Sequence, residues 1–322
     1  MTTSRITSVA VAITALALAS VCATFDDSTA GGASRSASLE AAAHADERMR
    51  TSRRLASAEK HAYGWPIKPF DRQHPVRGFF GDPRIANHGE SRQFHFGIDM
   101  SAPNGTPVYA TITGRVTIHP LHPTTILVAG DSGVEFSYWH VVPVVRGGER
   151  AVAYRTVIGH IDAPYGHVHF SEKRDGRYLN PLRPGALGPF VDDTTPTAGS
   201  VVLSSGELVA ETYDETPLAV PRPWHDLPVM PALVRWRLLD ARGGVEIGWR
   251  TAVDFRLTIP HASAFDDMWA SGTTQNHVRD PGRYRLALTR DLREGRYVVE
   301  VAVSDTRANA SERRFPLDLS TS

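Results

Sequence analysis

The chain has almost no cysteine, with Cys22 as the one thiol among 322 residues. A single thiol excludes an intramolecular disulfide framework and any metal site that needs several thiolates. An excess of charge is also lacking, because 35 Lys and Arg residues balance 35 Asp and Glu residues. This balance argues against a nucleic-acid binder, which would use a basic excess or a basic run to neutralise phosphates. In contrast, the chain has fourteen histidines, and this high number needs an explanation.

Residues 1–23 have the pattern of a secretory signal. Arg5 supplies a positive charge, and Val9 to Val21 form an apolar run that is too short to span a bilayer comfortably. Cleavage after Ala23 would fit the small residues around it, so we expect a protein that is secreted or held in the cell envelope, without a transmembrane helix in the mature chain. A lipoprotein anchored through Cys22 is the alternative, but Val21 is a poor residue before a lipidated cysteine. We favour simple secretion.

The rest of the chain divides into a linker and two folded modules. Residues 24–62 mix charges with Ala and Ser and have few large apolar side chains, which predicts a linker or a loose helical stalk. From residue 63 onward, short β-branched and aromatic runs alternate with Gly, Pro, Asn and Asp, which indicates a mainly β architecture. The Pro- and Gly-rich stretch 180–191 marks a boundary between modules at 63–190 and 191–322.

The second module has a signature of its own. Leu292, Gly295 and Tyr297 enter an alternating strand in the Leu-x-x-Gly-x-Tyr pattern of a tyrosine corner, which predicts an immunoglobulin-like β-sandwich. The turn Asp305–Asn309 resembles the Asp-x-x-Gly-Asn turn of bacterial immunoglobulin-like domains, with Ala308 in place of Gly. By analogy of fold, we expect this module to support the first one or to bind the cell wall or a protein partner.

Nine of the fourteen histidines fall within 63–190, so the chemistry is expected there. On a β-strand, His167 and His169 would share one face, because successive side chains point to opposite sides. His95 and Asp99 would add an imidazole and a carboxylate. Two imidazoles and a carboxylate with an open fourth position are typical of catalytic zinc.

Each of these pieces alone is weak. A His-x-His pair is usually half-exposed strand surface, a His-x-x-x-Asp pair is often a turn, and a strand-end histidine such as His140 is usually just hydrogen-bonded. Their joint occurrence in one β module strengthens the case. No His-Glu-x-x-His helix motif is present, which excludes that route to a zinc site.

Seven short pieces occur in one order along this module. They are Phe80-Gly81-Asp82-Pro83-Arg84, His95-Phe96-Gly97-Ile98-Asp99, Gly105-Thr106-Pro107-Val108-Tyr109-Ala110, Gly114-Arg115-Val116, Tyr138-Trp139-His140, Val157-Ile158-Gly159 and Gly166-His167-Val168-His169-Phe170. Through these pieces, residues 64–183 resemble the lysostaphin-type (LytM-type) zinc metallopeptidases, which are peptidoglycan endopeptidases. The resemblance implies an antiparallel β-sheet peptidase domain.

The resemblance also implies roles for individual residues. His95, Asp99 and His169 match the three zinc ligands, and His140 and His167 match the two non-ligand histidines of the active site. The implied activity is zinc-assisted hydrolysis of peptide bonds in bacterial peptidoglycan, with one Zn²⁺ per chain. The family's Gln near position 156 and its Pro before the last His-x-His are absent, which affects substrate preference more than activity.

Two alternatives remain open at this point. Family members without zinc ligands regulate other cell-wall hydrolases, and a wall-binding protein could use its zinc only structurally. The sequence also leaves open which bond is cleaved and which of His140 and His167 is the base. The other histidines of the module are expected on loops or turns, and two of them, His119 and His122, could line a substrate groove. These other histidines are His74, His88, His119, His122 and His160.

Overall fold

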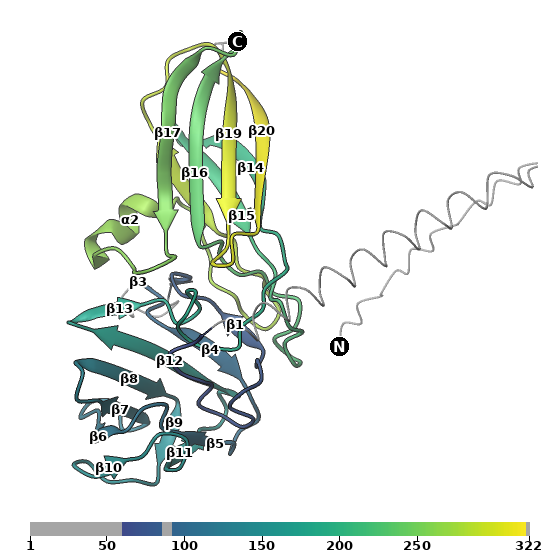
Figure 1. Cartoon of the computed structure of the whole chain (residues 1–322). Coiled ribbons are helices and arrows are strands. Elements are labelled where there is room, and N and C mark those ends of the chain that lie inside the picture. The colour runs from purple at the N-terminus through teal and green to yellow at the C-terminus, as the bar shows by residue number, and fades with distance from the viewer. Residues whose placement is uncertain (1–59, 86–91, 320–322) are drawn as a thin grey trace, which may run out of the picture. The chain divides into compact units, whose positions relative to one another are not determined.

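The computed structural model of the chain describes residues 60–85 and 92–319, and all of them belong to one compact unit. The predicted signal at 1–23 with Cys22, the linker as far as residue 59, and His88 lie outside the described residues. Within the described part, the chain is almost entirely β, with antiparallel sheets, as predicted (Figure 1). No helix of this part is long and apolar enough to cross a membrane.

The largest sheet positions the predicted site. Its strand order is β1-β4-β12-β8-β7-β6-β10, with β13 paired to β12. The eight strands of this sheet among the described residues are β1 (Val76–Gly78), β4 (Ile98–Ser101), β6 (Gly114–Ile118), β7 (Thr125–Ala129), β8 (Val134–Trp139), β10 (Arg150–Ala151), β12 (His167–Arg174) and β13 (Arg177–Leu179). β12 therefore lies between β4 and β8, and it pairs antiparallel with both.

Two smaller sheets complete this part of the chain. One has the order β5-β11-β9, from β5 (Pro107–Tyr109), β11 (Val157–Ile161) and β9 (Val141–Pro143), and the other pairs β2 (Pro83–Arg84) with β3 (Gln93–Phe94). His160 lies in β11, so the expectation of a loop or turn at His160 is wrong. Gly159, beside His160, packs closely against β9, because a Cβ at this position would lie 2.4 Å from the carbonyl oxygen of Val142. His74, His119 and His122 lie outside strands, as expected.

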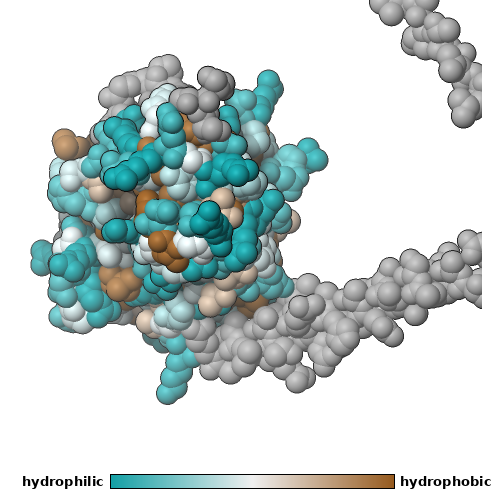
Figure 2. Space-filling view, turned by 90° about the horizontal axis from the view of Figure 1, so that it is seen from above, coloured by the Kyte–Doolittle hydropathy of each residue, from teal (hydrophilic) through white to brown (hydrophobic). Residues whose placement is uncertain are grey.

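Residues 191–319 form two antiparallel sheets of their own. Their orders are β14-β15-β18 and β17-β16-β19-β20. The elements of this part are β14 (Thr197–Ser204), β15 (Glu207–Tyr213), β16 (Leu233–Asp240), β17 (Val245–Asp254), the 3₁₀ helix η1 (Ala262–Ala264), α2 (Phe265–Met268), β18 (Arg285–Thr289), β19 (Arg296–Ser304) and β20 (Ala310–Asp318). In the view of Figure 2, hydrophilic residues predominate, and hydrophobic ones occur singly or in small groups.

Two local predictions for this part can be compared with the structure. The hydroxyl of Tyr297 donates to the carbonyl of Arg293 at 3.1 Å, which is the bond that a tyrosine corner requires. In the turn after β19, Asp305 Oδ1 accepts from the backbone N–H groups of Arg307 and Asn309. Ala308 occupies the glycine position of this turn with a φ of +66°. The immunoglobulin-like assignment as a whole and the module boundary near residue 190 stay predictions.

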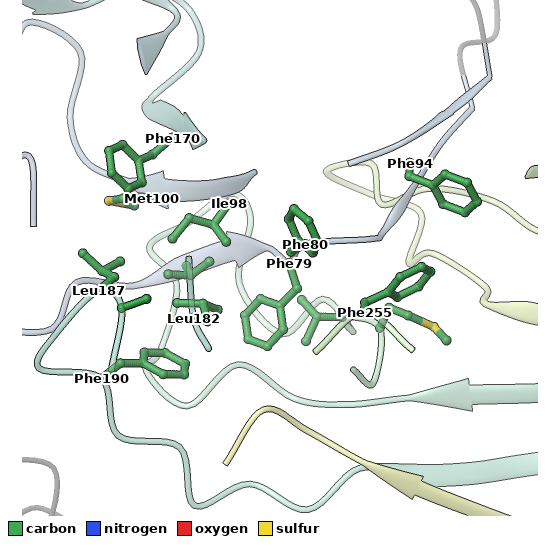
Figure 3. Packing of buried hydrophobic residues seen from close by; sticks show 14 of the residues in the cluster. Phe79, Phe80, Phe94, Ile98, Met100, Phe170, Leu182, Leu187, Phe190 and Phe255 are labelled. Carbon is green, nitrogen blue, oxygen red and sulfur yellow. The ribbon is translucent and has the colours of Figure 1, made fainter. Parts of the chain in front are cut away.

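Aromatic and aliphatic side chains form the core beneath the large sheet. Ile98 and Met100 of β4 and Phe170 of β12 are fully buried and lie close together in Figure 3. The ring of Phe170 stacks on that of Phe136 from β8 with 5.1 Å between centroids. The same cluster includes Phe255, whose ring lies 5.7 Å from that of Phe94, so residues from both sides of the predicted boundary share buried contacts.

A buried ion pair anchors the strand that carries the two paired histidines. Glu172, on β12 and 1% exposed, receives two hydrogen bonds from Arg183, at 2.6 and 2.8 Å. The Tyr63 hydroxyl donates to the same carboxylate at 2.5 Å. Because both Glu172 oxygens are paired, the charge is compensated although it is buried.

Replacing Glu172 by Gln should therefore destabilise the protein, because the partly buried Arg183 guanidinium loses its counter-charge. We expect the free energy of unfolding to fall by about 3 kcal/mol, as measured by urea denaturation. Tyr63→Phe removes one hydrogen bond to the same carboxylate and should cost only about 1.5 kcal/mol. Equal losses for the two variants would contradict this account of the ion pair.

A second prediction concerns Ala308. Because its φ lies in the left-handed region, where a Cβ is unfavourable, Ala308→Gly should raise the free energy of unfolding by about 0.5–1 kcal/mol. Ala310→Gly, two residues later at the start of β20, is the matched control and should lower it by a similar amount. Thermal and urea unfolding would measure both, and destabilisation by Ala308→Gly would show that the turn is unstrained.

Candidate metal centre

The centre is built on the antiparallel pairing of β4 with β12. In this register Asp99 is directly opposite His169, so their side chains lie on the same face of the sheet. His95 lies between β3 and β4, and Gly97 lets this segment approach β12. A Cβ at Gly97 would lie 2.6 Å from Ser171 Oγ and 2.8 Å from His169 Nε2, so only glycine fits here.

Three side-chain atoms converge on one point. His95 Nε2 and His169 Nδ1 are 2.7 Å apart, and each lies 3.1 Å from Asp99 Oδ1. All three residues are buried, with residue exposures of 2%, 6% and 9% for His95, His169 and Asp99. The structure thus brings together the three residues that the sequence singled out as metal ligands.

The hydrogen bonds of the two imidazoles show which ring nitrogen carries the proton and which one has a free lone pair. His95 Nδ1 lies 2.7 Å from the carbonyl oxygen of Phe79, so this nitrogen carries the proton and Nε2 presents a lone pair. His169 Nε2 lies 2.9 Å from Ser171 Oγ, and when it donates there, Nδ1 also presents a lone pair. Two lone pairs and a carboxylate oxygen then face one another, an arrangement that a cation stabilises.

Charges around the centre favour the same protonation states. Burial alone would raise the pKa of Asp99, but the neighbouring His95 and Arg84 hold it well below its usual range. Arg84 Nη2 donates to Asp99 Oδ2 at 2.6 Å, which leaves Oδ1 for the histidines. Burial lowers the pKa of His95, and it lowers that of His169 to about 3. At neutral pH the centre therefore holds two neutral imidazoles and one carboxylate.

His167 and His140 lie beside these three residues. His167 Nε2 is 3.5 Å from Asp99 Oδ1, and the His140 ring centroid is 4.7 Å from that of His167. His140 follows β8 directly, with a φ of +62°, and stacks on Tyr165 with 4.0 Å between ring centroids. Burial and then the proximity of His167 lower the pKa of His140 to about 3, so its imidazole is neutral at neutral pH.

Arg77 orients His167. Its Nη2 lies 2.6 Å from His167 Nδ1 and donates to the carbonyl of Tyr165 at 2.8 Å. His167 Nδ1 also lies 3.0 Å from the carbonyl oxygen of Tyr165, which can only accept. The shorter contact with Arg77, whose guanidinium can only donate, and the position of Nε2 beside Asp99 Oδ1 favour the tautomer with the ring proton on Nε2. The Arg77 guanidinium also lies 4.3 Å from the ring centroid of Trp224.

Aromatic groups form one side of the centre. The ring centroids of Phe96 and Trp139 lie 4.7 and 6.2 Å from that of His169. The rings of His119 and His122 pack on that of Trp139, with 5.8 and 5.1 Å between centroids. That these two histidines line a substrate groove stays a prediction. Sequence reasoning missed Arg77, Tyr165 and Trp224, because no spacing rule relates them to the histidine motifs.

The donor set fits a zinc ion. Ligand atoms of a tetrahedral zinc at about 2.0–2.1 Å are roughly 3.3 Å apart, and the three atoms here are 2.7–3.1 Å apart. Nitrogen and carboxylate oxygen are ligands that zinc accepts, and three protein ligands leave a position for water or substrate. The hydrogen bonds from the imidazoles to Phe79 and Ser171 are the outer contacts that orient metal-binding histidines.

Comparison with curated proteins finds one group of relatives. The DD-carboxypeptidase/endopeptidases Mpg of Neisseria meningitidis serogroup B and Neisseria gonorrhoeae are 30% identical over 99 residues, which covers 28% of this chain. The chain spans only 22% of the length of these relatives. No family model matches the chain.

Several solved structures are similar over part of the chain. A zinc-containing peptidase from Vibrio cholerae is 23% identical with a TM-score of 0.31, covering 38% of this chain and 39% of its own. The catalytic domain of the prophage-encoded protein EnpA from Enterococcus faecalis is 23% identical with a TM-score of 0.26, and the similarity covers 38% of this chain and 95% of that domain. A chain of the SpoIIQ–SpoIIIAH pore-forming complex is 22% identical with a TM-score of 0.31, and the similarity covers 38% of this chain and 89% of that one. At these scores, the function of this chain has to be argued from its own residues.

The geometry predicts which histidines hold a metal. We expect the metal-stripped chain to bind one equivalent of Zn²⁺, and His95→Ala, Asp99→Ala or His169→Ala to weaken this binding by more than about 100-fold. His140→Ala should leave the stoichiometry at one, because His140 is not part of the triangle of ligand atoms. Atomic emission of the dialysed protein and Co²⁺ absorption spectra would measure this.

His160→Ala is the matched control, because His160 lies in β11 and outside the centre. It should bind Zn²⁺ like the parent chain. Loss of zinc from His140→Ala together with retention by His169→Ala would show that the ligand set is wrong.

Proposed function

We propose that the chain is a secreted or envelope-located zinc metalloendopeptidase that hydrolyses peptide bonds in bacterial peptidoglycan. The observation that carries the proposal is the convergence of His95, Asp99 and His169 on one point, with His140 and His167 beside it. The likeness to the Neisseria DD-carboxypeptidase/endopeptidases adds the substrate class.

His95, Asp99 and His169 would hold the zinc ion. When bound, the ion supplies Lewis-acid chemistry, polarising the peptide carbonyl and making water acidic enough to attack it at neutral pH. The Asp99 carboxylate and the two neutral imidazoles would offset only one of the two charges of the ion, so the loaded centre would stay positive and would favour a carbonyl oxygen. Phe96 and Trp139 shield the His169 side of the site from water.

The two other histidines have different roles in this scheme. His167 presents Nε2–H towards the centre, because Arg77 donates to its Nδ1. It is therefore suited to donate a hydrogen bond to the oxygen of the scissile carbonyl as negative charge develops there. His140 is neutral and has a free lone pair, so it is suited to take the proton from the attacking water and pass it to the leaving amine.

A non-catalytic envelope regulator with the same fold is the alternative. In such a protein we would expect at least one ligand position or one of the two flanking histidines to be lost. All five residues are present here and lie together, which favours the peptidase.

Mass spectrometry of fragments released from purified peptidoglycan tests the proposal. The parent chain should release peptide fragments, whereas His169→Ala should release none above the level without enzyme. His160→Ala should behave like the parent chain. Identical products from the parent chain and from His169→Ala would remove the endopeptidase function and would favour the regulator.

The flanking histidines give a separate test. His140→Ala and His167→Ala should keep their zinc and lose turnover by about 10²–10⁴-fold, the usual contribution of a positioned acid or base. Metal analysis beside a peptide-release assay would measure both quantities. Turnover within a few-fold of the parent chain in either variant would overturn the assigned role.

Arg77 is expected to act through His167. Arg77→Met should keep zinc and substrate affinity but lower kcat by about 10- to 100-fold, because the His167 tautomer is no longer held. Arg77→Lys should restore part of the activity, because its ammonium group can still donate. A change of KM with unchanged kcat would instead place Arg77 in substrate binding.

A further inference from the structure

A second group of carboxylates lies in the other part of the chain. Asp192 lies in the segment before β14, Asp214 directly follows β15, and Asp305 directly follows β19. One carboxylate oxygen from each lies within 4.8 Å of the others, and the residues are only 6%, 1% and 3% exposed. β15 and β19 belong to different sheets, so the group joins both sheets to the segment that enters them.

The hydrogen bonds of this group are incomplete. Both oxygens of Asp305 are paired, Oδ1 with the N–H groups of Arg307 and Asn309, and Oδ2 with Asn309 Nδ2 at 2.6 Å. Asp192 Oδ1 accepts from Thr194, and Asp214 Oδ1 accepts from the N–H of Glu215 at 2.8 Å. The Oδ2 atoms of Asp192 and Asp214 are buried without a hydrogen-bond donor among the described residues.

Two unpaired oxygens in this place are unfavourable unless something neutralises them. Burial and the neighbouring carboxylates raise the pKa of Asp192 to about 7 and that of Asp214 to about 8, and burial raises the pKa of Asp305. The other charged groups that act on the group are Asp193, which adds repulsion, and Arg307, which reduces it. Either protons or a cation must therefore accompany the folded state near neutral pH.

The ligand atoms are all oxygen, which selects the kind of cation. Ca²⁺ binds six to eight oxygens at about 2.3–2.6 Å in irregular geometry, so two ligand oxygens across the ion are up to about 5 Å apart. The three carboxylate oxygens lie within 4.8 Å of one another, so one such ion could contact all three. Thr194 Oγ1, 2.5 Å from Asp192 Oδ1, and the backbone carbonyl of Glu215, to which Thr194 donates, are further oxygens close by. Zn²⁺ would favour nitrogen or sulfur ligands, and Mg²⁺ would demand near-octahedral geometry.

The geometry points to a calcium-binding site formed by Asp192, Asp214 and Asp305, whose ion ties the segment between the two modules to the ends of β15 and β19. This segment is already bonded to the first module, because the side chain of Gln73 exchanges two hydrogen bonds with the backbone of Val191, at 2.7 and 2.8 Å. A bound ion thus stabilises the junction between the modules.

A cavity lies next to the group. A cavity of about 580 Å³ has Asp214 and Glu215 among its lining residues, together with Asp226 from the loop that precedes Val229. All three of these residues are acidic, so the cavity attracts cations towards the group.

Thermal unfolding of the metal-stripped full chain tests the site. Adding CaCl2 at about 100 times its Kd should raise Tm by about 5 °C, and MgCl2 at the same concentration should raise it less. Isothermal titration with CaCl2 should give one equivalent. The measurement is made without zinc, so it is independent of the peptidase proposal.

Conservative variants separate a bound ion from a merely structural group. Asp192→Asn and Asp214→Asn should fold, lose most of the calcium-induced rise in Tm and, in calcium-free buffer at pH 8, have a Tm equal to or above that of the parent chain, because repulsion is relieved. Asp193→Asn, on the exposed neighbour in the same segment, should keep the rise. Asp99→Ala should also keep it, because Asp99 belongs to the other centre.

Two outcomes would overturn the site. The first is an equal calcium-induced rise in the parent chain and in both Asn variants. The second is the absence of any rise in the parent chain, together with a Tm that falls as pH increases from 6 to 9 and no longer falls in Asp214→Asn. That pattern follows from a carboxyl group with a raised pKa, whose stabilising proton is lost as pH rises, and it would assign the group to protons instead of a cation.

Discussion

Asp99 and His169 lie directly opposite each other on β4 and β12, and the rest of the centre depends on this antiparallel register. A shift of either strand by one residue would turn its own ligand side chain to the core face, where Ile98, Met100 and Phe170 now pack. The large apolar residues on that face and the buried Glu172–Arg183 ion pair oppose such a shift. The forces that stabilise the sheet therefore also hold the proposed metal ligands in place.

The two candidate metal-binding groups among the described residues differ in how their buried carboxylates are compensated. Asp99 is buried beside Arg84 and two imidazoles, and its pKa lies well below the usual range. Asp192 and Asp214 are buried beside other carboxylates, and their pKa values are raised to about 7 and about 8. Nitrogen ligands suit zinc in the first group, and an all-oxygen set suits calcium in the second. The chain thus has a candidate zinc site and a separate candidate calcium site.

Several features could be predicted because they are local. The period of a strand places His167 and His169 on one face, and the Leu-x-x-Gly-x-Tyr pattern leads to the Tyr297–Arg293 hydrogen bond. Other features could not be predicted, because they depend on contacts between distant segments. Arg77 reaches His167 across 90 positions of the sequence, and Asp192, Asp214 and Asp305 meet only after two sheets have formed. The expectation of a loop or turn at His160 was wrong because β11 forms only by pairing with β5 and β9, which are distant in sequence.

The mainly β class and the concentration of histidine within 63–190 could be read from the sequence, because composition and strand period are properties of neighbouring residues. The set of five residues at the centre came from the resemblance that the ordered motifs carry. Tertiary structure alone decided which imidazole nitrogen faces inward, which tautomer Arg77 imposes on His167, and that three aspartates share a buried site. Each of these depends on hydrogen bonds and burial between segments far apart in the chain, and sequence spacing carries no information on either.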